Sequence, residues 1–280
     1  MVHETAELVA ATELPESEPP SHKAASQAGT QFDYEAIPAG YYDRIMREGN
    51  PIRRLWHVSK FERVLDYLPS ASAQSILDIG CFAGTFLSMV PKERFSRQLG
   101  VDILPAQIEY ANRTYGTSYR QFRHVPSITH LRSIEGSFDC VTLIEVIEHL
   151  NPAEINDLFG ELARLIRPSG KLVLTTPNYL SSWPLLEQIL NRLSEVSYEE
   201  QHITRFTYFN MERKLAELYG PLSSQFDLDL KTTTHFVTPF LAGLSYNLAR
   251  TLSRLVPHTS WRMPFGNLVL MVLTRREQTT

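Results

Sequence analysis

The sequence predicts an α/β protein with an open, mostly parallel β-sheet, helices on both faces and an antiparallel edge. Between Ser75 and Thr176, short apolar runs alternate with amphipathic stretches, which is the pattern of strands joined by helical crossovers. The first run is followed directly by two glycines, Gly80 and Gly84, as expected where a strand turns into a helix. Two late apolar runs, the last without a helix after it, predict the antiparallel edge.

Each element follows from its own stretch of sequence. The predicted strands are residues 75–80, 97–104, 118–124, 138–146, 170–177, 224–237 and 265–277. The predicted helices are residues 52–68, 86–95, 105–116, 127–136, 152–168, 211–220 and 240–256. The last helix would place Phe240, Leu244, Leu248 and Leu252 on one apolar face, which we expect to pack against a neighbouring insertion.

Composition divides the chain into a tail and a folded part. Residues 1–30 are rich in Glu, Pro, Ser and Ala and are expected to form a disordered tail, because they bury too little to offset their ordering entropy. Residues 31–70 form a helical cap, and residues 71–280 form the main domain. Segments at about 178–210 and 237–262 are expected to be insertions in this domain.

Charge and cysteine content limit the classes of partner and compartment. The 27 basic and 31 acidic residues give a formal charge of -4 with no basic block, which disfavours nucleic acid as the main partner. Cys81 and Cys140 lie far apart in apolar stretches, which indicates free thiols in a reducing compartment. The acidic N-terminus lacks the features of a signal peptide, and no apolar run is long enough for a transmembrane span. We therefore expect a cytoplasmic protein.

The stretch ILDIGCFAGTF, residues 76–86, predicts a ligand loop at the carboxyl end of the first strand. Its pattern D-x-G-x-x-x-G has neither the third glycine of a dinucleotide loop nor the Lys-Ser/Thr of a P-loop. About twenty residues further on, Asp102 ends the second strand, where its carboxylate can accept hydrogen bonds from both hydroxyls of a ribose. These features indicate a nucleoside that carries no pyrophosphate.

From about Tyr41 to its C-terminus the chain resembles the class I S-adenosylmethionine-dependent methyltransferases. The resemblance rests on LDIGCFAGTF, GVDI, FDCVTLIEVIEHL and LIRPSGKLVLTTPN, which occur in the order and spacing of that family's motifs. It implies a Rossmann-like, seven-stranded sheet, S-adenosyl-L-methionine as cofactor and S-adenosyl-L-homocysteine as product.

The resemblance also implies a cofactor site. Its residues would be Asp78, Gly80, Cys81, Phe82, Gly84, Asp102, Ile103, Gln107, Ser127 and Glu145. Asp78, Gly80, Cys81 and Gly84 would line the methionine part, Asp102 would bind the ribose, and Ile103 would pack on the adenine. Phe82 stands where the family often has glycine, so either the loop is wider here or this side chain turns away from the ligand into helix packing. Ser127 or a backbone carbonyl would meet the adenine amino group in place of the family's frequent Asp.

The stretch EVIEHL, with Glu145, Glu148 and His149, ends the fourth strand, and His202 lies far along the chain. We predict that His202 or His149 accepts the proton of the methyl acceptor, with His202 slightly favoured; the alternatives are that His202 ties the insertion to the core and that His149 opens a helix. A similar Glu-x-x-Glu-His with a distant His occurs in small-RNA 2′-O-methyltransferases that use a divalent ion. The same letters occur in metal-free relatives, and we expect no metal.

The resemblance further implies that the insertions at about 178–210 and 237–262 cover the substrate and that the cap forms an aromatic wall of the acceptor pocket. Its members would be Tyr41, Tyr42, Trp56 and His57, although helix packing is an alternative role for Trp56. The predicted reaction is O-methylation of a small-molecule, sugar, lipid-linked or natural-product acceptor by a monomer or homodimer. The alternatives are a metal-dependent RNA 2′-O-methyltransferase, N- or C-methylation, and a cofactor-binding module without catalysis. Peripheral membrane contact through residues 240–256 is a further alternative.

Overall fold

The computed structural model describes residues 34–69, 73–193, 202–218, 222–255 and 263–277. The chain divides into Met1–Gln31 and Phe32–Thr280, and all described residues belong to the second unit. The predicted disordered tail lies outside the described residues.

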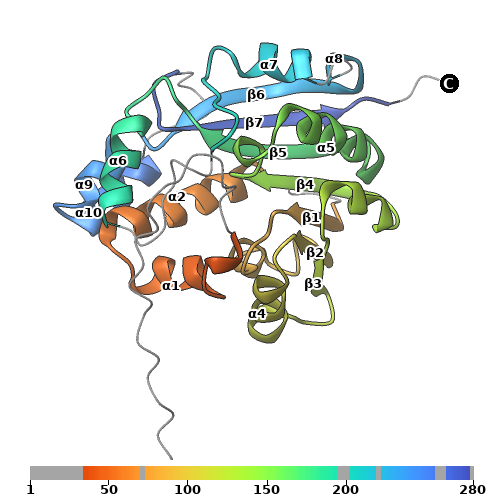
Figure 1. Ribbon diagram of the computed structural model, residues 1–280, viewed down its shortest axis with the longest axis horizontal. Coiled ribbons are helices and arrows are strands. Elements are labelled where there is room, and N and C mark those ends of the chain that lie inside the picture. The colour runs from red at the N-terminus through yellow and green to blue at the C-terminus, as the bar shows by residue number, and fades with distance from the viewer. Residues whose placement is uncertain (1–33, 70–72, 194–201, 219–221, 256–262, 278–280) are drawn as a thin grey trace, which may run out of the picture. The chain divides into compact units, whose positions relative to one another are not determined.

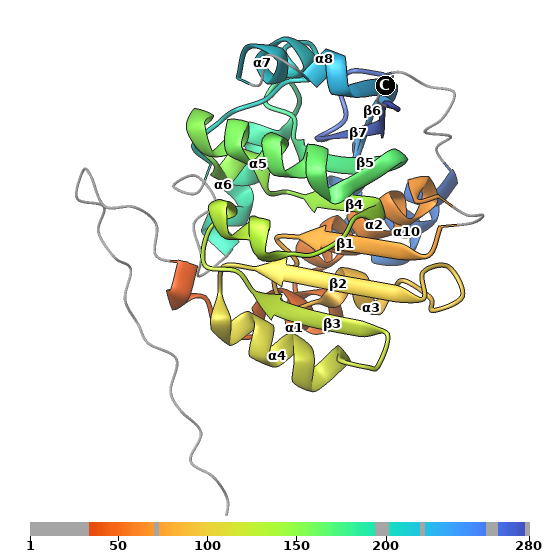
Figure 2. The ribbon, with the colours of Figure 1, turned by 90° about the vertical axis from the view of Figure 1, so that its right-hand side faces the viewer.

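A seven-stranded sheet forms the centre of the protein, in the order β3-β2-β1-β4-β5-β7-β6 (Figure 2). Its strands are β1 (Ser75–Ile79), β2 (Arg97–Asp102), β3 (Arg120–His124), β4 (Phe138–Ile144), β5 (Ile166–Pro177), β6 (Phe226–Thr234) and β7 (Leu268–Arg275). The first five strands are parallel, and β7 pairs antiparallel with both β5 and β6. The predicted mixed sheet with an antiparallel edge is therefore confirmed.

Helices connect and cover these strands (Figure 1). The α-helices are α1 (Tyr41–Glu48), α2 (Pro51–Tyr67), α3 (Thr85–Ser88), α4 (Pro105–Tyr115), α5 (Pro152–Leu165), α6 (Trp183–Leu193), α7 (Met211–Leu218), α8 (Leu222–Gln225), α9 (Thr238–Ala242) and α10 (Tyr246–Leu255). Three short 3₁₀ helices are η1 (Tyr34–Ala36), η2 (Ile128–Ser133) and η3 (Ile147–His149). None of the helices in the described ranges is both long and apolar enough to span a membrane.

Alternation along the strands divides the core between the two faces of the sheet. Leu77 of β1 packs in a cluster that includes Leu158 of α5 and Leu215 of α7. Its neighbour Ile76 packs in a second cluster with residues of α2, α3 and α4. Because successive side chains of a strand point to opposite faces, both faces of the central strands are apolar and both are covered.

Three predicted helices are shorter than their sequence pattern indicated. The helix expected over 152–168 ends at Leu165, and residues 166–168 already belong to β5. The helix expected over 86–95 ends at Ser88, ahead of Pro91, which cannot donate the backbone hydrogen bond that a continuing helix needs. The stretch 127–136 forms only the 3₁₀ helix η2.

The prediction of a single helix over 240–256 is wrong, because the chain forms two helices, α9 and α10, with a break at residues 243–245. Leu244, expected on the buried face, is 87% exposed in this break, and Leu248 is also exposed. The buried contact instead runs through the small residues Ala242 and Ala249, which pack on Leu55 of α2. The pair therefore packs mainly on α2, while Phe240 of α9 also packs on a cluster that includes Trp183 and Leu186 of the predicted insertion.

The N-terminal cap is fastened to α4 by buried polar groups. The Gln107 side chain accepts from the Gly40 N–H over 2.9 Å and donates to the Ile37 and Pro38 carbonyls over 3.1 Å each. Asp43 of α1 is 2% exposed and accepts from the hydroxyls of Tyr110, Tyr115 and Thr85. This network places α1 beside the first βα loop.

Candidate active site

The loop after β1 needs glycine for two separate reasons. Gly80 and Gly84 have φ of 77° and 76°, in the left-handed region that disfavours a side chain. A Cβ on Gly80 would lie 2.5 Å from the Val146 side chain, and one on Gly84 would lie 2.6 Å from the Phe122 ring. The turn is drawn back onto β2, because the N–H groups of Gly80 and Cys81 both donate to the Val101 carbonyl.

Phe82 occupies the middle of this loop in a left-handed conformation, with φ of 46°. Its ring lies 4.9 Å from that of Tyr42, so the side chain packs against helix α1 of the cap. The Cys81 side chain is buried in the core beneath the loop, where it can face a ligand only through its backbone.

Asp102 is held in place by the backbone around it. Its Oδ2 accepts the Phe82 N–H over 2.8 Å, and its Oδ1 accepts the Leu104 N–H over 3.0 Å. Burial raises the pKa of this carboxyl, and the backbone donors oppose that rise. Each oxygen keeps a further lone pair for a ligand hydroxyl. Beside it, the Ile103 side chain is 51% exposed and offers an apolar surface.

These features fit the nucleoside part of S-adenosylmethionine. The fixed carboxylate matches the two ribose hydroxyls, the exposed isoleucine matches the adenine face, and the glycine turn gives access to the backbone. Ser127 is less directly available, because its hydroxyl hydrogen-bonds Thr129 and His130 over 2.8 Å each. Gln107 uses its amide group to hold the cap, so its predicted contact with the cofactor would need that network to open.

Asp78 is buried at the end of β1. Its Oδ1 accepts the Thr142 hydroxyl of β4 over 2.6 Å. Burial raises the pKa of Asp78 to about 7, while Thr142 and Lys60 oppose the rise. A carboxyl poised near neutrality becomes ionised readily when a cationic ligand group approaches.

Glu145 directly follows β4 and has a positive φ of 55°. Its Oε1 accepts the Trp56 indole N–H over 3.1 Å, and its Oε2 is ion-paired with Lys60. Lys60 is 4% exposed and was not predicted as a site residue, because a single lysine in a helix gives no sequence signal. This ion pair joins α2 to the carboxyl end of the sheet, and in Figure 1 the arrowhead of β4 points to the side where α2 lies.

The expected aromatic wall is mostly buried. Tyr41, Trp56 and His57 are each less than 7% exposed, and only Tyr42 of the four is half-buried. Trp56 stacks on Trp183 of α6 with ring centroids 4.6 Å apart. Burial lowers the pKa of His57 well below its usual value, and Lys60 adds to this effect. In this conformation Trp56 serves helix packing, the alternative role considered for it.

Three residues of the predicted constellation, Glu148, His149 and His202, come together, whereas Glu145 lies outside this cluster in an ion pair of its own. One potential ligand atom from each lies within 4.8 Å of the others. Glu148 is 0% exposed, and neither of its carboxylate oxygens has a hydrogen bond of good geometry among the described residues, although the buried Thr176 side chain lies close enough to favour its charged form. Burial raises the pKa of Glu148 to about 7, whereas the nearby His202 favours its charged form.

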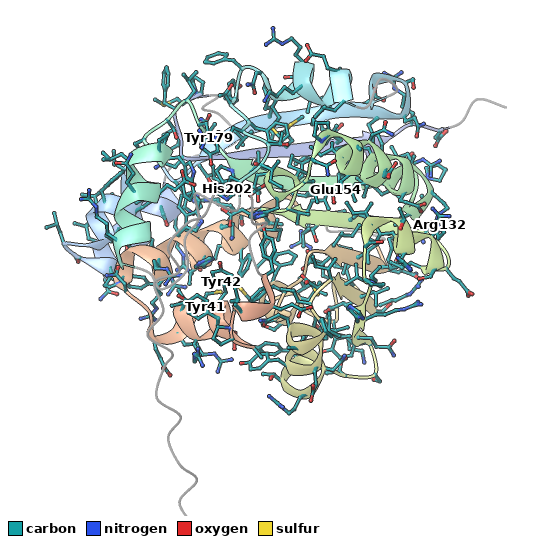
Figure 3. All side chains as sticks on the ribbon, viewed as in Figure 1. Tyr41, Tyr42, Arg132, Glu154, Tyr179 and His202 are labelled. Carbon is teal, nitrogen blue, oxygen red and sulfur yellow. The ribbon has the colours of Figure 1, made fainter. Side chains whose placement is uncertain are left out.

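Both imidazoles of this cluster are held at Nδ1 by residues that the sequence did not single out. His149 Nδ1 lies 3.0 Å from the Tyr34 hydroxyl, and His202 Nδ1 lies 2.9 Å from Oε1 of Glu187. Figure 3 labels His202 together with its second partner, Tyr179, whose hydroxyl lies 2.7 Å from Nδ1. None of these three partners belongs to a sequence motif. Only the tertiary structure identifies Tyr34, Tyr179 and Glu187 as partners of the two histidines.

The surroundings of His202 have opposing effects on its pKa. Burial alone would lower the pKa, but the hydrogen bond to Glu187 and the charges of Glu148 and Glu187 raise it above its usual value. Such an imidazole can accept a proton and hold it. The same Glu148, His149 and His202 are the described residues whose donor atoms fit a divalent cation.

Comparison with known proteins identifies the class. A family model described as a methyltransferase domain matches residues 51–219. A ubiquinone biosynthesis O-methyltransferase from Dechloromonas aromatica is 25% identical over 209 residues, which cover 67% of this chain and 83% of the relative. The tRNA N(3)-methylcytidine methyltransferase trm140 of Schizosaccharomyces pombe is 28% identical over 199 residues, which cover 67% of this chain and 64% of the relative.

Solved structures share the fold at low sequence identity. A methyltransferase in complex with the Trm112 methyltransferase activator of Haloferax volcanii has a TM-score of 0.56 and 15% identity, covering 85% of this chain and 99% of the other. Fold and sequence together define a class I S-adenosylmethionine-dependent methyltransferase. The chain belongs to the methyltransferase-domain family, whose model matches more than half of its length.

Proposed function

We propose that this enzyme transfers the methyl group of S-adenosylmethionine to a hydroxyl oxygen of a small-molecule acceptor. The observation that carries the proposal is the buried His202, which is held at Nδ1 by Glu187 and grouped with Glu148 and His149. An unactivated hydroxyl needs a base as it is methylated, and this cluster supplies one.

The cofactor would be held at the carboxyl ends of β1, β2 and β4. Asp102 would accept the ribose hydroxyls, Ile103 would pack on the adenine, and Asp78 and Glu145 would face the methionine part. When bound, S-adenosylmethionine supplies an already electrophilic methyl carbon, so correct positioning provides most of the rate. Asp78, with its raised pKa, gains a partner when the ammonium of the methionine part binds.

His202 would take the acceptor's hydroxyl proton. With Nδ1 engaged by Glu187, the nitrogen that remains for the acceptor is Nε2. The Glu187 carboxylate then stabilises the imidazolium that forms. His149 is the second candidate base, and its contact with Tyr34 ties it to the cap.

The class of acceptor is inferred from the chain's charge and relatives. A net charge of -4 without a basic block favours a small molecule over a polynucleotide. One relative is named as a ubiquinone biosynthesis O-methyltransferase, which agrees with oxygen as the acceptor atom. The tRNA methyltransferase among the relatives keeps nitrogen methylation and a nucleic-acid substrate as alternatives. The remaining alternatives are carbon methylation and a binding module without catalysis.

A second mechanism is favoured by one observation, the buried Glu148 carboxylate, which has no hydrogen bond of good geometry among the described residues. Glu148, His149 and His202 could hold a divalent cation, which would give the Glu148 carboxylate a partner. The acceptor oxygen would then be activated by the cation and His202 would be a ligand instead of the base. This is the metal-dependent alternative that the sequence left open, and metal-free transfer remains our first proposal.

The test is a screen of phenolic, sugar, lipid-linked and RNA acceptors with methyl-labelled S-adenosylmethionine. We expect label in an ether of a small-molecule hydroxyl, and about 30-fold less label with the Asp102→Ala variant at a cofactor concentration below the wild-type Kd. Label in RNA alone, or on nitrogen or carbon, would replace the proposed acceptor.

The two buried free cysteines agree with a cytosolic location, and we propose a monomer or homodimer.

A further inference from the structure

The hydrogen-bond network around His202 determines where the imidazole proton lies. The Tyr179 hydroxyl donates to Oε1 of Glu187 over 3.2 Å, and His202 Nδ1 lies 2.9 Å from the same oxygen. The Tyr179 oxygen also lies 2.7 Å from Nδ1. Because its single proton is donated to Glu187, this hydroxyl can only accept a hydrogen bond from Nδ1–H. An ionised carboxylate accepts hydrogen bonds but donates none, so the proton between Nδ1 and Glu187 belongs to the imidazole. In the neutral ring, Nε2 therefore carries the lone pair.

The hydrogen bond between His202 and Glu187 is buried. The side chains of His202 and Glu187 are 4% and 7% exposed, so water does not compete with their hydrogen bond. Burial, together with the charge of Glu187, raises the pKa of Tyr179, which keeps its hydroxyl protonated as a donor. The carboxylate thus receives two hydrogen bonds from two side chains that donate one each.

Packing against the cap positions Glu187. Trp183 lies one helical turn before Glu187 in α6, so both project from one face of the helix. The buried Trp183 ring stacks on Trp56 of α2, whose indole N–H in turn holds Glu145. One contact between α2 and α6 therefore supports both Glu145 and the partner of His202.

We propose that Glu187 is a positioning residue for methyl transfer: by accepting Nδ1–H of His202, with Tyr179 as the second partner, it presents the Nε2 lone pair to the acceptor. This inference rests on the proposed function, because Glu187 would act only through His202. Both residues come from the segment expected to cover the substrate, so this segment would supply the base as well as the group that orients it.

The experiment compares Glu187→Gln, Tyr179→Phe and the control Gln188→Ala, which changes the exposed neighbour of Glu187. Long-range ¹⁵N–¹H spectra of histidine-labelled protein in EDTA report the tautomer of His202, whose signals are assigned with His202→Ala. Wild type should show the proton on Nδ1, and Glu187→Gln should shift it towards Nε2, because a glutamine amide can donate to Nδ1. Turnover should fall roughly tenfold to a hundredfold, by analogy with partners that orient metal-ligating imidazoles, with KM and cofactor affinity nearly unchanged.

Tyr179→Phe keeps the carboxylate and should lose only roughly threefold in turnover, without a change of tautomer. It removes a hydrogen bond to an uncharged group, which contributes less than one to a carboxylate. Gln188→Ala should behave as wild type. An unchanged tautomer in Glu187→Gln would overturn the proposal, whatever the activity of this variant. The proposal would also be overturned if Glu187→Gln changed the tautomer but kept full turnover while His202→Ala was inactive. A changed tautomer combined with full activity of His202→Ala would refute His202 as the base and leave its orientation by Glu187 supported.

Discussion

Asp102 and His202 mark the two ends of the proposed site, and they are held by different kinds of structure. The partners of Asp102 are backbone N–H groups of Phe82 and Leu104, which lie in the loops directly after β1 and β2. The partners of His202 are the side chains of Tyr179 and Glu187, which lie in the predicted insertion after β5 together with His202 itself. The cofactor end is thus built into the turns of the sheet, whereas the acceptor end depends on how added segments pack.

This difference predicts where substitutions should have local or distant effects. At the cofactor end, the loops keep their shape through glycine conformations and backbone hydrogen bonds, so a changed side chain should affect mainly its own ligand contact. At the acceptor end, His202, Glu187 and Trp183 depend on one another, so changes should be non-additive. The following experiments test this comparison, from the largest expected effect to the smallest.

The largest change in free energy is expected at Asp78. Its folded pKa of about 7 exceeds the ordinary aspartate value near 3.9, so the native state binds the proton more tightly than the unfolded state. Stability from this group is full below about pH 4 and is lost as pH rises to about 7. Three units correspond to about 4 kcal/mol, so Asp78→Asn should stabilise the cofactor-free protein by up to that amount at pH 8.

Urea unfolding at pH 8 and pH 5 measures this effect. The stabilisation should shrink at pH 5, and cofactor affinity should fall in the same variant because a ligand-facing charge is lost. Asp157→Asn, at an exposed position of α5, is the matched control and should change neither property. Equal stability of Asp78→Asn and wild type at both pH values would show that Asp78 is not held as a buried charge.

The next largest effect is expected at the acceptor end. His202→Ala should lower turnover by ~100-fold or more, the usual contribution of a general base, while cofactor affinity stays nearly intact. Protonation of His202 removes the lone pair that a base needs, so the wild-type rate should fall with decreasing pH. Because the pKa of His202 is raised, this fall should begin at a higher pH than for an ordinary histidine with a pKa near 6.5. His149→Ala is the paired variant and should lose less. Near-normal turnover in both variants on the true acceptor would mean that neither imidazole is the base.

The same difference explains what could be predicted from the sequence. Strands β1 to β5 and their loops were predictable because alternation, glycines and a strand-terminal acid are local signals. The connection between α9 and α10 was not, because small residues such as Ala249 form its buried contact while larger ones such as Leu244 face solvent. His202 was recognisable as a chemical group, but its partner Glu187 was one carboxylate among 31 acidic residues until the fold placed them together.

A smaller effect, confined to the cofactor, is expected at Asp102. Loss of its paired hydrogen bonds to ribose in Asp102→Ala should cost roughly 2 kcal/mol, or about 30-fold in affinity for S-adenosylmethionine or S-adenosylhomocysteine. Isothermal titration measures this, with micromolar binding expected for wild type. Asp227→Ala, an exposed residue of β6, serves as the control. An unchanged affinity in Asp102→Ala would remove this residue from the site.

The smallest expected effect is that of chelation, and it separates the two mechanisms proposed for the acceptor end. If His202 is the base, the cluster needs no cation, and turnover should be unchanged after exhaustive treatment with EDTA. Without a cation, the buried Glu148 is accommodated by protonation, since its pKa of about 7 allows it to be neutral, and Glu148→Gln should then keep most of the activity. A bound cation predicts the opposite for both experiments: activity lost in EDTA and restored by magnesium or manganese, and a large loss in Glu148→Gln because an amide is a poorer ligand than a carboxylate. That result would make His202 a metal ligand, and the acceptor end would then be organised around an ion instead of a proton.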